Sequence, residues 1–291
     1  MRYILGISAL CILLWSCNDK PAANQTGKNI VKANTAQNTD FDTSAGASKQ
    51  NLINFEKGKV SSTKKLANGI VIKWIKRGKG PRFQAGEMAL IDYRLALPDG
   101  KIVDGNNRIK LPFIPFVIGY SMQTAGWDLA FTELRVGDFV KVEIPAVLAY
   151  GAKGIKNVIE PNTDNWLFVK VISKVQPSID TDGIRSWRLA QGEPFELAAD
   201  AEKEIAYEFI ASTPSRSNAI NARKFPLRFV PGQKTVVPGL RKILKNALKG
   251  ERYYVILSPN QAYGKKGYNN IIGPNESVFF MVDILGVRSI S

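Results

Sequence analysis

Residues 149–162 read AYGAKGIKNVIEPN, and residues 262–275 read AYGKKGYNNIIGPN. The two stretches lie 113 residues apart, which is the separation between Tyr150 and Tyr263. The same separation relates further pairs without a gap: Phe116 and Phe229, Gly126 and Gly239, Gly137 and Gly250, Pro161 and Pro274. Self-similarity at one fixed spacing indicates two copies of one module. Each copy is about a hundred residues long, which is the size of a domain.

Hydrophobic periodicity predicts strands and one helix in each copy. In the first copy, apolar runs predict strands over residues 69–75, 88–97, 111–118, 140–144 and 166–175. Trp127, Phe131 and Leu134 have the spacing of one face of an amphipathic helix. In the second copy, strands are predicted over 205–211, 253–257 and 278–287, with a helix over 240–247. One helix against several antiparallel strands predicts an α+β fold for each copy.

The length of 291 residues suits two domains. The pattern places the first domain at residues 51–176 and the second, degenerate copy at residues 203–291. Residues 177–202 then form a linker, with Trp187 as an anchor for part of it.

The N-terminal segment predicts export and lipidation. In residues 1–17, a basic Arg2 precedes an apolar run that is too short to span a bilayer, as in a signal peptide. Its end, Leu-Trp-Ser-Cys17, resembles the bacterial lipobox, in which the cysteine is lipidated. An ordinary signal peptide with an incidental cysteine is the alternative. Residues 18–50 have almost no large apolar side chains, so we expect a disordered tether that anchors the folded part to the bacterial cell envelope.

The amino-acid composition argues against several classes of partner and catalytic site. The net charge is +15, but the basic residues are scattered, so we interpret them as a solvated face near anionic lipid and expect no nucleic-acid partner. The chain has no histidine, which argues against His-dependent acid–base catalysis and the usual zinc sites. Its only cysteines, Cys11 and Cys17, lie in the signal segment. We therefore expect neither a metal nor a cofactor.

Several short motifs span residues 67–175 in a fixed order. They are Asp99-Gly-Lys-Ile-Val-Asp104, Phe116-x-x-Gly119, Gly126-Trp127, Val136-Gly-Asp, Ala149-Tyr-Gly and Ile159-Glu-Pro-Asn. In order and spacing they resemble the domain of FKBP-type peptidyl-prolyl isomerases. The resemblance implies a twisted antiparallel sheet wrapped around one helix, and rotation of X–Pro bonds in unfolded or extended chains. This reaction suits a chain without histidine, because an apolar pocket that stabilises the twisted amide makes and breaks no bond.

The resemblance assigns catalytic roles to four residues. Trp127 would form the pocket floor, and Tyr150 would donate its hydroxyl to the substrate carbonyl. Asp104, held by Tyr93, would direct its carboxylate into the pocket. From the residues alone, three of them have plainer interpretations: a core tryptophan on an amphipathic helix, a tyrosine packed in a glycine-rich turn, and a turn aspartate.

Five further residues would contact the substrate. They are Val103, Phe116 and Leu167 as apolar walls, and Gln123 and Thr124 at the start of the helix, where a backbone N–H would hold the substrate chain. The three walls are equally consistent with core packing. The family usually has aromatic walls and an aliphatic pair at these places, so we expect a larger and less dry pocket here.

The second copy keeps a pocket but changes its chemistry. Its matched positions are Phe209, Phe229, Val236, Val237, Leu240, Tyr263 and Phe280. Leu240 replaces Trp127, Phe209 replaces Tyr93, and no aspartate matches Asp104. We therefore expect this copy to be weakly active or inactive, and to serve as a peptide-binding or spacing unit.

Three functions remain open at this point. An isomerase that assists the folding of exported proteins, active mainly through the first domain, fits the set of Trp127, Tyr150 and Asp104. A non-catalytic, chaperone-like lipoprotein that binds proline-containing extended chains fits the degenerate second copy. A purely structural envelope component would require both pockets to be closed.

Overall fold

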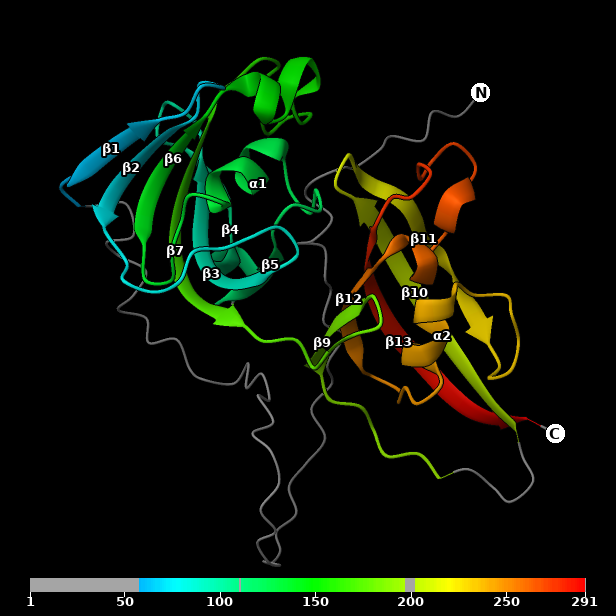
Figure 1. The fold of residues 1–291 in the computed structure, drawn as a ribbon. Coiled ribbons are helices and arrows are strands. Elements are labelled where there is room, and N and C mark those ends of the chain that lie inside the picture. Colours follow the sequence, from blue (N-terminus) through cyan, green and yellow to red (C-terminus); the bar gives the residue numbers. More distant parts are fainter. Residues whose placement is uncertain (1–57, 110, 197–201, 291) are drawn as a thin grey trace, which may run out of the picture.

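The computed structural model describes residues 58–109, 111–196 and 202–290. Figure 1 shows two curved β-sheets side by side, each with one α-helix against its concave face. We call residues 58–176 the first domain and residues 177–290 the second domain. Antiparallel sheets that each pack on one helix confirm the α+β class predicted from the sequence.

The first domain contains a seven-stranded sheet in the order β1-β2-β6-β7-β3-β4, with β5 paired to β3. Its strands are β1 (Ser62–Lys65), β2 (Val71–Lys76), β3 (Met88–Ala96), β4 (Ile102–Gly105), β5 (Ile114–Val117), β6 (Phe139–Ile144) and β7 (Asn165–Val175). Its helices are α1 (Ala125–Phe131) and the 3-10 turns η3 (Asn106–Ile109), η4 (Ala146–Leu148) and η5 (Gly151–Lys153). Alternation decides the buried face: Val140, Val142 and Ile144 of β6 are buried, as predicted.

The second domain contains a six-stranded sheet in the order β11-β10-β13-β12-β9-β8. Its strands are β8 (Ile179–Thr181), β9 (Ile184–Ala190), β10 (Glu202–Thr213), β11 (Arg216–Phe229), β12 (Arg252–Leu257) and β13 (Val278–Ile290). Its helices are α2 (Pro238–Leu244), η6 (Pro259–Gln261) and η7 (Gly264–Lys266). Strand β11 lies at the edge of the sheet and most of its side chains are exposed or half-buried, so its sequence lacks the apolar pattern that would have predicted it.

Strand register gives the structural match between the copies. Tyr93 pairs with Val169 in the first sheet, and Phe209 pairs with Val282 in the second. Val169 and Val282 have the same spacing as Tyr150 and Tyr263, so Phe209 occupies the place of Tyr93, as predicted.

The predicted linker over residues 177–202 is wrong in part. Its first half forms the hairpin of β8 and β9, and β9 pairs with β12 inside the second sheet. Asp182 and Gly183 make the turn with φ of 51° and 75°, and Ile184 and Trp187 are buried on opposite faces of the sheet. The second domain therefore begins before residue 203. The hairpin is the counterpart of β1 and β2 at the same end of the first sheet. It was missed because Gly183 lies 114 residues after Gly69 and not 113, so the fixed spacing does not align the two.

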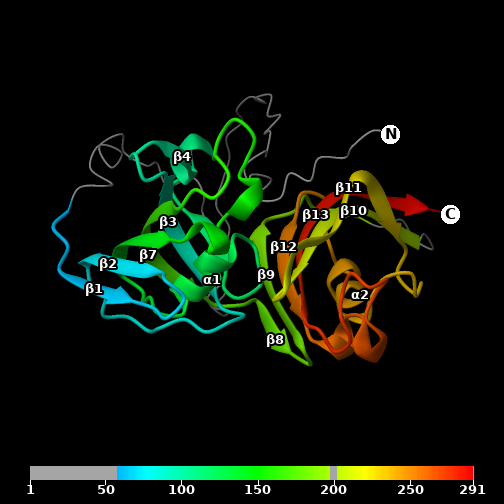
Figure 2. The same cartoon turned by 90° about the horizontal axis from the view of Figure 1, so that it is seen from above.

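The two domains pack against each other through an apolar face of the second sheet. On β13, Phe280 and Val282 face the second core, whereas Phe279 and Met281 belong to a cluster that is continuous with the first core. The other second-domain members of that cluster are Trp187, Ile210, Tyr254 and Ile256. Seen from above, β9 and β12 lie at the seam next to the first domain (Figure 2). An apolar interface of this kind opposes the independent motion that is usual for linked domains.

The predicted signal peptide, lipidated Cys17 and tether lie outside the described residues. Within the part of the chain that the structure describes, neither helix is long and apolar enough to cross a bilayer.

Candidate active site

The indole of Trp127 lies in an aromatic cluster of the first domain. Helix α1 directs it toward the sheet, where 2% of its surface is exposed. Its ring meets Tyr93 edge-on at 5.1 Å and Phe116 at a tilt at 5.6 Å between centroids. Phe131, one turn further along α1, stacks on it at 6.3 Å. Trp127 is thus a core residue, and it also brings together the strands that carry the other candidates.

Asp104 is a buried carboxylate with a defined partner. It lies within β4 rather than in the turn at Asp99, and it is 5% exposed. The Tyr93 hydroxyl donates a hydrogen bond to its Oδ2 at 2.9 Å. Burial raises the pKa of Asp104, while hydrogen bonds from Gly105 N–H and Tyr93 and the charge of Arg108 oppose that rise. The contact that the family resemblance implied between Tyr93 and Asp104 is present.

Tyr150 completes a group of three polar side chains near the indole. Burial raises the pKa of Tyr150 above its usual value, and the nearby charge of Asp104 raises it further. The pKa of Tyr93 is also raised, chiefly by burial and then by Asp104 and Tyr150. Both hydroxyls therefore keep their protons at neutral pH and are hydrogen-bond donors.

The loop that carries Tyr150 is fixed by its own backbone. Ile155 N–H donates to Ile159 O at 2.7 Å, and Asn162 N–H donates to Gly151 O at 2.8 Å. Gly154 has a φ of +56°, and a Cβ there would lie 2.3 Å from Ile159 O, so only glycine fits. Gly154 is thus required by the close approach of the backbone.

The predicted walls lie in the core that contains Trp127. Val103, Phe116 and Leu167 are 3%, 1% and 0% exposed, and all three belong to that cluster. Gln123 is buried, and Thr124 is the N-cap of α1 with a side chain that makes no capping hydrogen bond. Gln123 and Thr124 therefore end the β5–α1 loop beside the first turn of the helix that holds Trp127.

Two polar residues near this site were not identified from the sequence. Asn106 Oδ1 accepts a hydrogen bond from Tyr93 N–H at 2.7 Å, and its Nδ2 donates to Leu111 O and Pro112 O at 2.9 Å each. The Arg108 guanidinium donates to Val103 O and lowers the pKa of Asp104. Both lie in a polar stretch that reads as a loop, and no local periodicity distinguishes them.

The second domain places a different set of side chains in the matched positions. Leu240 on α2 is 2% exposed where the first domain has Trp127. Phe209 meets Phe280 edge-on at 5.4 Å and stacks on Tyr207 at 6.3 Å. Burial raises the pKa of Tyr263 to about 12. Of the remaining candidates, Phe229 is buried, and Val236 and Val237 are half-buried against the same core.

Register identifies the residue that replaces the aspartate. In the first sheet Leu95 pairs with Asp104, and in the second sheet the equivalent Ala211 pairs with Ile220. The donor is changed as well, since Phe209 has no hydroxyl where Tyr93 has one. The second domain therefore presents an apolar pair in place of the hydrogen-bonded pair of the first.

The family is shown by sequence. The model of FKBP-type peptidyl-prolyl cis-trans isomerases matches residues 80–172 and again residues 192–285, which is more than half of the chain. The chain belongs to this family and carries two of its domains. The second match begins at residue 192, after β8 and β9, so the hairpin precedes the part of the second domain that the family model covers.

Individual relatives match over one domain or a little more. The 46 kDa FK506-binding nuclear protein of Spodoptera frugiperda is 36% identical over 34% of this chain and 24% of its own length. FK506-binding protein 4 of Rhizopus delemar is 37% identical over 38% of this chain and 28% of its own length. The chain thus spans about a quarter of these relatives. Among solved structures, the three FKBP domains of wheat FKBP73 are 18% identical with a TM-score of 0.38, over 78% of this chain and 99% of that one.

Proposed function

We propose that this protein is a peptidyl-prolyl cis-trans isomerase that works mainly through its first domain. The observation that supports this most directly is the hydrogen bond from Tyr93 to Asp104 beside the Trp127 indole. The second domain lacks each of these three elements, with Phe209, Ile220 and Leu240 at the same positions.

The reaction to be catalysed is a rotation. Resonance holds an amide planar with a barrier of about 18–20 kcal/mol, and X–Pro bonds exchange in tens to hundreds of seconds. The twisted state loses conjugation, so its carbonyl is less polarised and it is solvated less strongly than the planar amide. An apolar site that excludes water therefore favours the twisted state, and each 1.36 kcal/mol of this preference raises the rate tenfold.

Each candidate residue of the first domain has its own role in stabilising the twisted amide. Trp127 offers a flat apolar surface to the pyrrolidine ring, and Tyr150 donates a hydrogen bond to the carbonyl on one side of the bond. Asp104 acts on the reacting amide through its charge, and Tyr93 fixes the orientation of that carboxylate. The backbone at Thr124 holds the substrate chain. No proton is transferred in this scheme, which agrees with tyrosines whose pKa values are raised.

The proposed substrates are unfolded or extended polypeptides that contain proline. Val103 and Leu167 are smaller than aromatic walls, so we propose that the site accepts varied residues before the proline. The lipobox at Cys17 and the polar tether support a location at the bacterial cell envelope, where the clients would be exported proteins.

A second candidate function is a holding chaperone that binds such chains without rotating them. The second domain favours it, because Phe209, Leu240 and Phe280 belong to one apolar cluster that Tyr263 packs against, without a carboxylate at the Asp104 position. In this view the second domain adds binding and the first adds catalysis.

The test is a protease-coupled isomerisation assay on residues 18–291, which keeps the domain interface. Trp127→Ala and Tyr150→Phe should each lower kcat/KM by at least about tenfold. The matched variants Leu240→Ala and Tyr263→Phe should leave it within about twofold of the wild type. Wild-type protein that binds proline peptides but does not accelerate the exchange would exclude catalysis and leave the holding function.

The anchor has a separate test. Metabolic labelling with a fatty acid should mark the full chain and should be lost in Cys17→Ser. Label that persists in that variant would contradict lipidation at this residue.

A further inference from the structure

The β5–α1 loop of the first domain (residues 118–124) contacts the second domain. This loop leads from β5 into α1, and it ends with Gln123 and Thr124, the residues proposed to hold the substrate chain. Two of its residues have positive φ: Gly119 at 81° and Ser121 at 52°. Such a conformation is strained for Ser121 and persists only where surrounding contacts hold it.

The first domain supplies part of these contacts. The Asp128 carboxylate on α1 accepts hydrogen bonds from Gly119 N–H at 2.7 Å and Ser121 N–H at 2.9 Å. These bonds tie the first half of the loop to the helix that it precedes. The side chains of Tyr120 and Ser121, however, contact the other domain.

The second domain supplies the rest. The Tyr120 ring lies 6.2 Å from Phe279 of β13 between centroids, and it is 9% exposed. Burial raises the pKa of Tyr120, and a hydrogen bond with Ser277 opposes the rise. Ser121 Oγ donates to Pro214 O, in the turn between β10 and β11, at 3.2 Å. Neighbouring residues of the loop are therefore held by two separate parts of the second domain.

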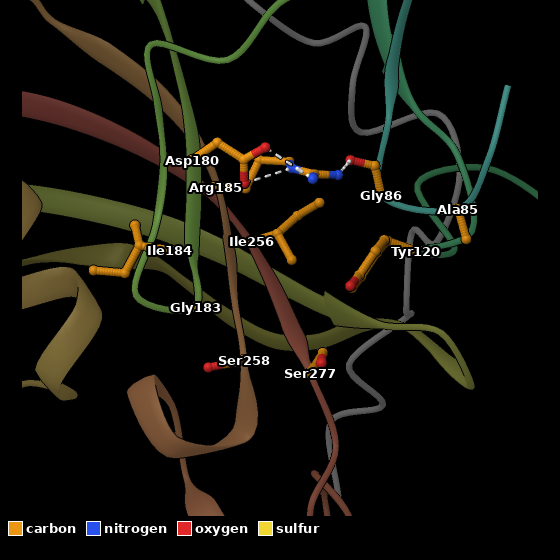
Figure 3. A pocket seen from close by; sticks show the side chains of 10 residues that line it. All are labelled: Ala85, Gly86, Tyr120, Asp180, Gly183, Ile184, Arg185, Ile256, Ser258 and Ser277. Carbon is orange, nitrogen blue, oxygen red and sulfur yellow. Dashed lines mark hydrogen bonds and ion pairs between the residues drawn. The ribbon is translucent and has the colours of Figure 1, made fainter.

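The surroundings of Tyr120 are also fixed. Figure 3 shows Arg185 reaching from β9 to Gly86 of the first domain. Tyr120, Ile256 and Ser277 line the same pocket as this contact. The guanidinium donates to Gly86 O at 2.9 Å and is paired with Asp180 at the same distance. Gly86 N–H in turn donates to Ile118 O at 2.8 Å, where the loop begins.

Comparison of the two copies shows that this face of the second sheet is specialised for contact. Lys141 and Glu143 of β6 form an ion pair on the outer face of the first sheet. Their counterparts at the fixed spacing are Tyr254 and Ile256, which are buried in the cluster shared with the first domain. Charged outward positions in one copy have thus become apolar contact positions in the other.

We propose that the second domain is a positioning unit for the first active site, and that Tyr120 and Ser121 are the positioning residues through which it acts. The inference rests on the proposed function of the first domain. By holding the β5–α1 loop, the second domain keeps the backbone of Gln123 and Thr124 in the conformation that receives the substrate chain. The degenerate copy is then retained for its outer face and its β10–β11 turn, not for its pocket.

The expected kinetic effect follows from where the ordering occurs. A loop that is already ordered loses little conformational entropy when the substrate binds. When the contact is removed, the loop loses that conformational entropy only when the substrate binds. This weakens the binding of the substrate and of the transition state to the same extent. Such a change raises KM and leaves kcat unchanged. We expect an increase in KM of about fivefold, which corresponds to about 1 kcal/mol.

The test compares variants of the domain interface, which we call seam variants, with a matched control, all in residues 18–291. Tyr120→Ala and Phe279→Leu should raise KM about fivefold with kcat unchanged. Tyr120→Phe should keep KM close to the wild-type value, because it keeps the ring. Amide hydrogen exchange in residues 118–124 should speed up in the first two variants. The control is Trp166→Ala, since Trp166 is the counterpart of Phe279 at the fixed spacing, on the outer face of the first sheet beside Lys141, away from the seam. This control should leave KM and exchange unchanged.

Titration of a proline-containing peptide, followed by tryptophan fluorescence, separates the two proposals. If the wild type binds but does not catalyse, the proposed function fails, and a Kd weakened about fivefold in Phe279→Leu still supports the positioning role. Folded seam variants with wild-type KM, wild-type Kd and unchanged exchange in the loop would overturn it.

Discussion

The Tyr93 hydroxyl lies 2.9 Å from Asp104 Oδ2 and donates to it, although these side chains are only 1% and 5% exposed. A carboxylate at such depth needs a donor, because burying an unpaired charge is costly. The pair therefore sets both the direction in which the acid points and the pH at which it carries its charge.

Tyr93→Phe should shift the pH dependence of the reaction. The hydrogen bond from Tyr93 lowers the pKa of Asp104 against the larger effect of burial, so its loss should raise that pKa further. The acidic limb of kcat/KM should move to higher pH, and the free energy of unfolding should fall by about 1–2 kcal/mol. A pH–rate profile measures the shift. Asp104→Asn is the control and should show no acidic limb, whereas an unmoved limb in Tyr93→Phe would argue against a charged Asp104 in the mechanism.

The pair can also be introduced into the second domain. Ile220→Asp alone should destabilise the protein by about 2 kcal/mol, because it places a carboxylate opposite Ala211 without a donor. Adding Phe209→Tyr should recover about 1 kcal/mol, since Phe209 occupies the place of Tyr93. Chemical denaturation of the two single variants and the double variant gives this coupling energy. Strictly additive effects would show that the two positions do not face each other as the register implies.

Much of this architecture could be predicted from the sequence because it is repeated. The Tyr150 loop is specified locally by Gly154, which no other residue can replace. The inner faces of β6 and β12 are specified by alternation. These signals repeat at one spacing, so each copy supports the interpretation of the other. The register aligns Phe209 with Tyr93, in agreement with the sequence match, although the segment from Phe209 to Phe229 is three residues shorter than the one from Tyr93 to Phe116.

The parts that were missed are those that depart from the fixed spacing or that lack a periodic pattern. The β8–β9 hairpin corresponds to β1–β2, but its turn glycine, Gly183, lies 114 residues after Gly69 and not 113, so the fixed spacing did not reveal it. Asn106 acts through hydrogen bonds to backbone groups, which leave no pattern in the sequence. The domain interface did leave a signal, in the change from Lys141 and Glu143 to Tyr254 and Ile256. It becomes informative only when the outer faces of both copies are compared.

The stability of the protein should depend on the titration of Asp128. Burial raises its pKa to about 6, against hydrogen bonds from Gly119 and Ser121. Since the folded pKa lies above the unfolded one, this group contributes most stability below about pH 4, and the contribution is lost as pH rises to about 6. Relative to Asp128→Asn, the wild type should therefore lose on the order of 2 kcal/mol of unfolding free energy between pH 4 and pH 7. Urea denaturation of both proteins at the two pH values measures the difference, and parallel curves would contradict the raised pKa.

The two tyrosine loops offer a matched pair of glycine substitutions. A Cβ on Gly154 would lie 2.3 Å from Ile159 O, and a Cβ on Gly267 would lie 2.2 Å from Ile272 O, both at positive φ. Gly154→Ala and Gly267→Ala should therefore destabilise the fold to a similar extent, by about 1–3 kcal/mol. Only Gly154→Ala should also lower kcat/KM, because it displaces Tyr150 from the proposed catalytic site, whereas Gly267→Ala displaces Tyr263. Thermal unfolding and the isomerisation assay on the same samples test both statements. Equal losses of activity would mean that the second loop also takes part in catalysis, and that the division of labour proposed for the two domains is wrong.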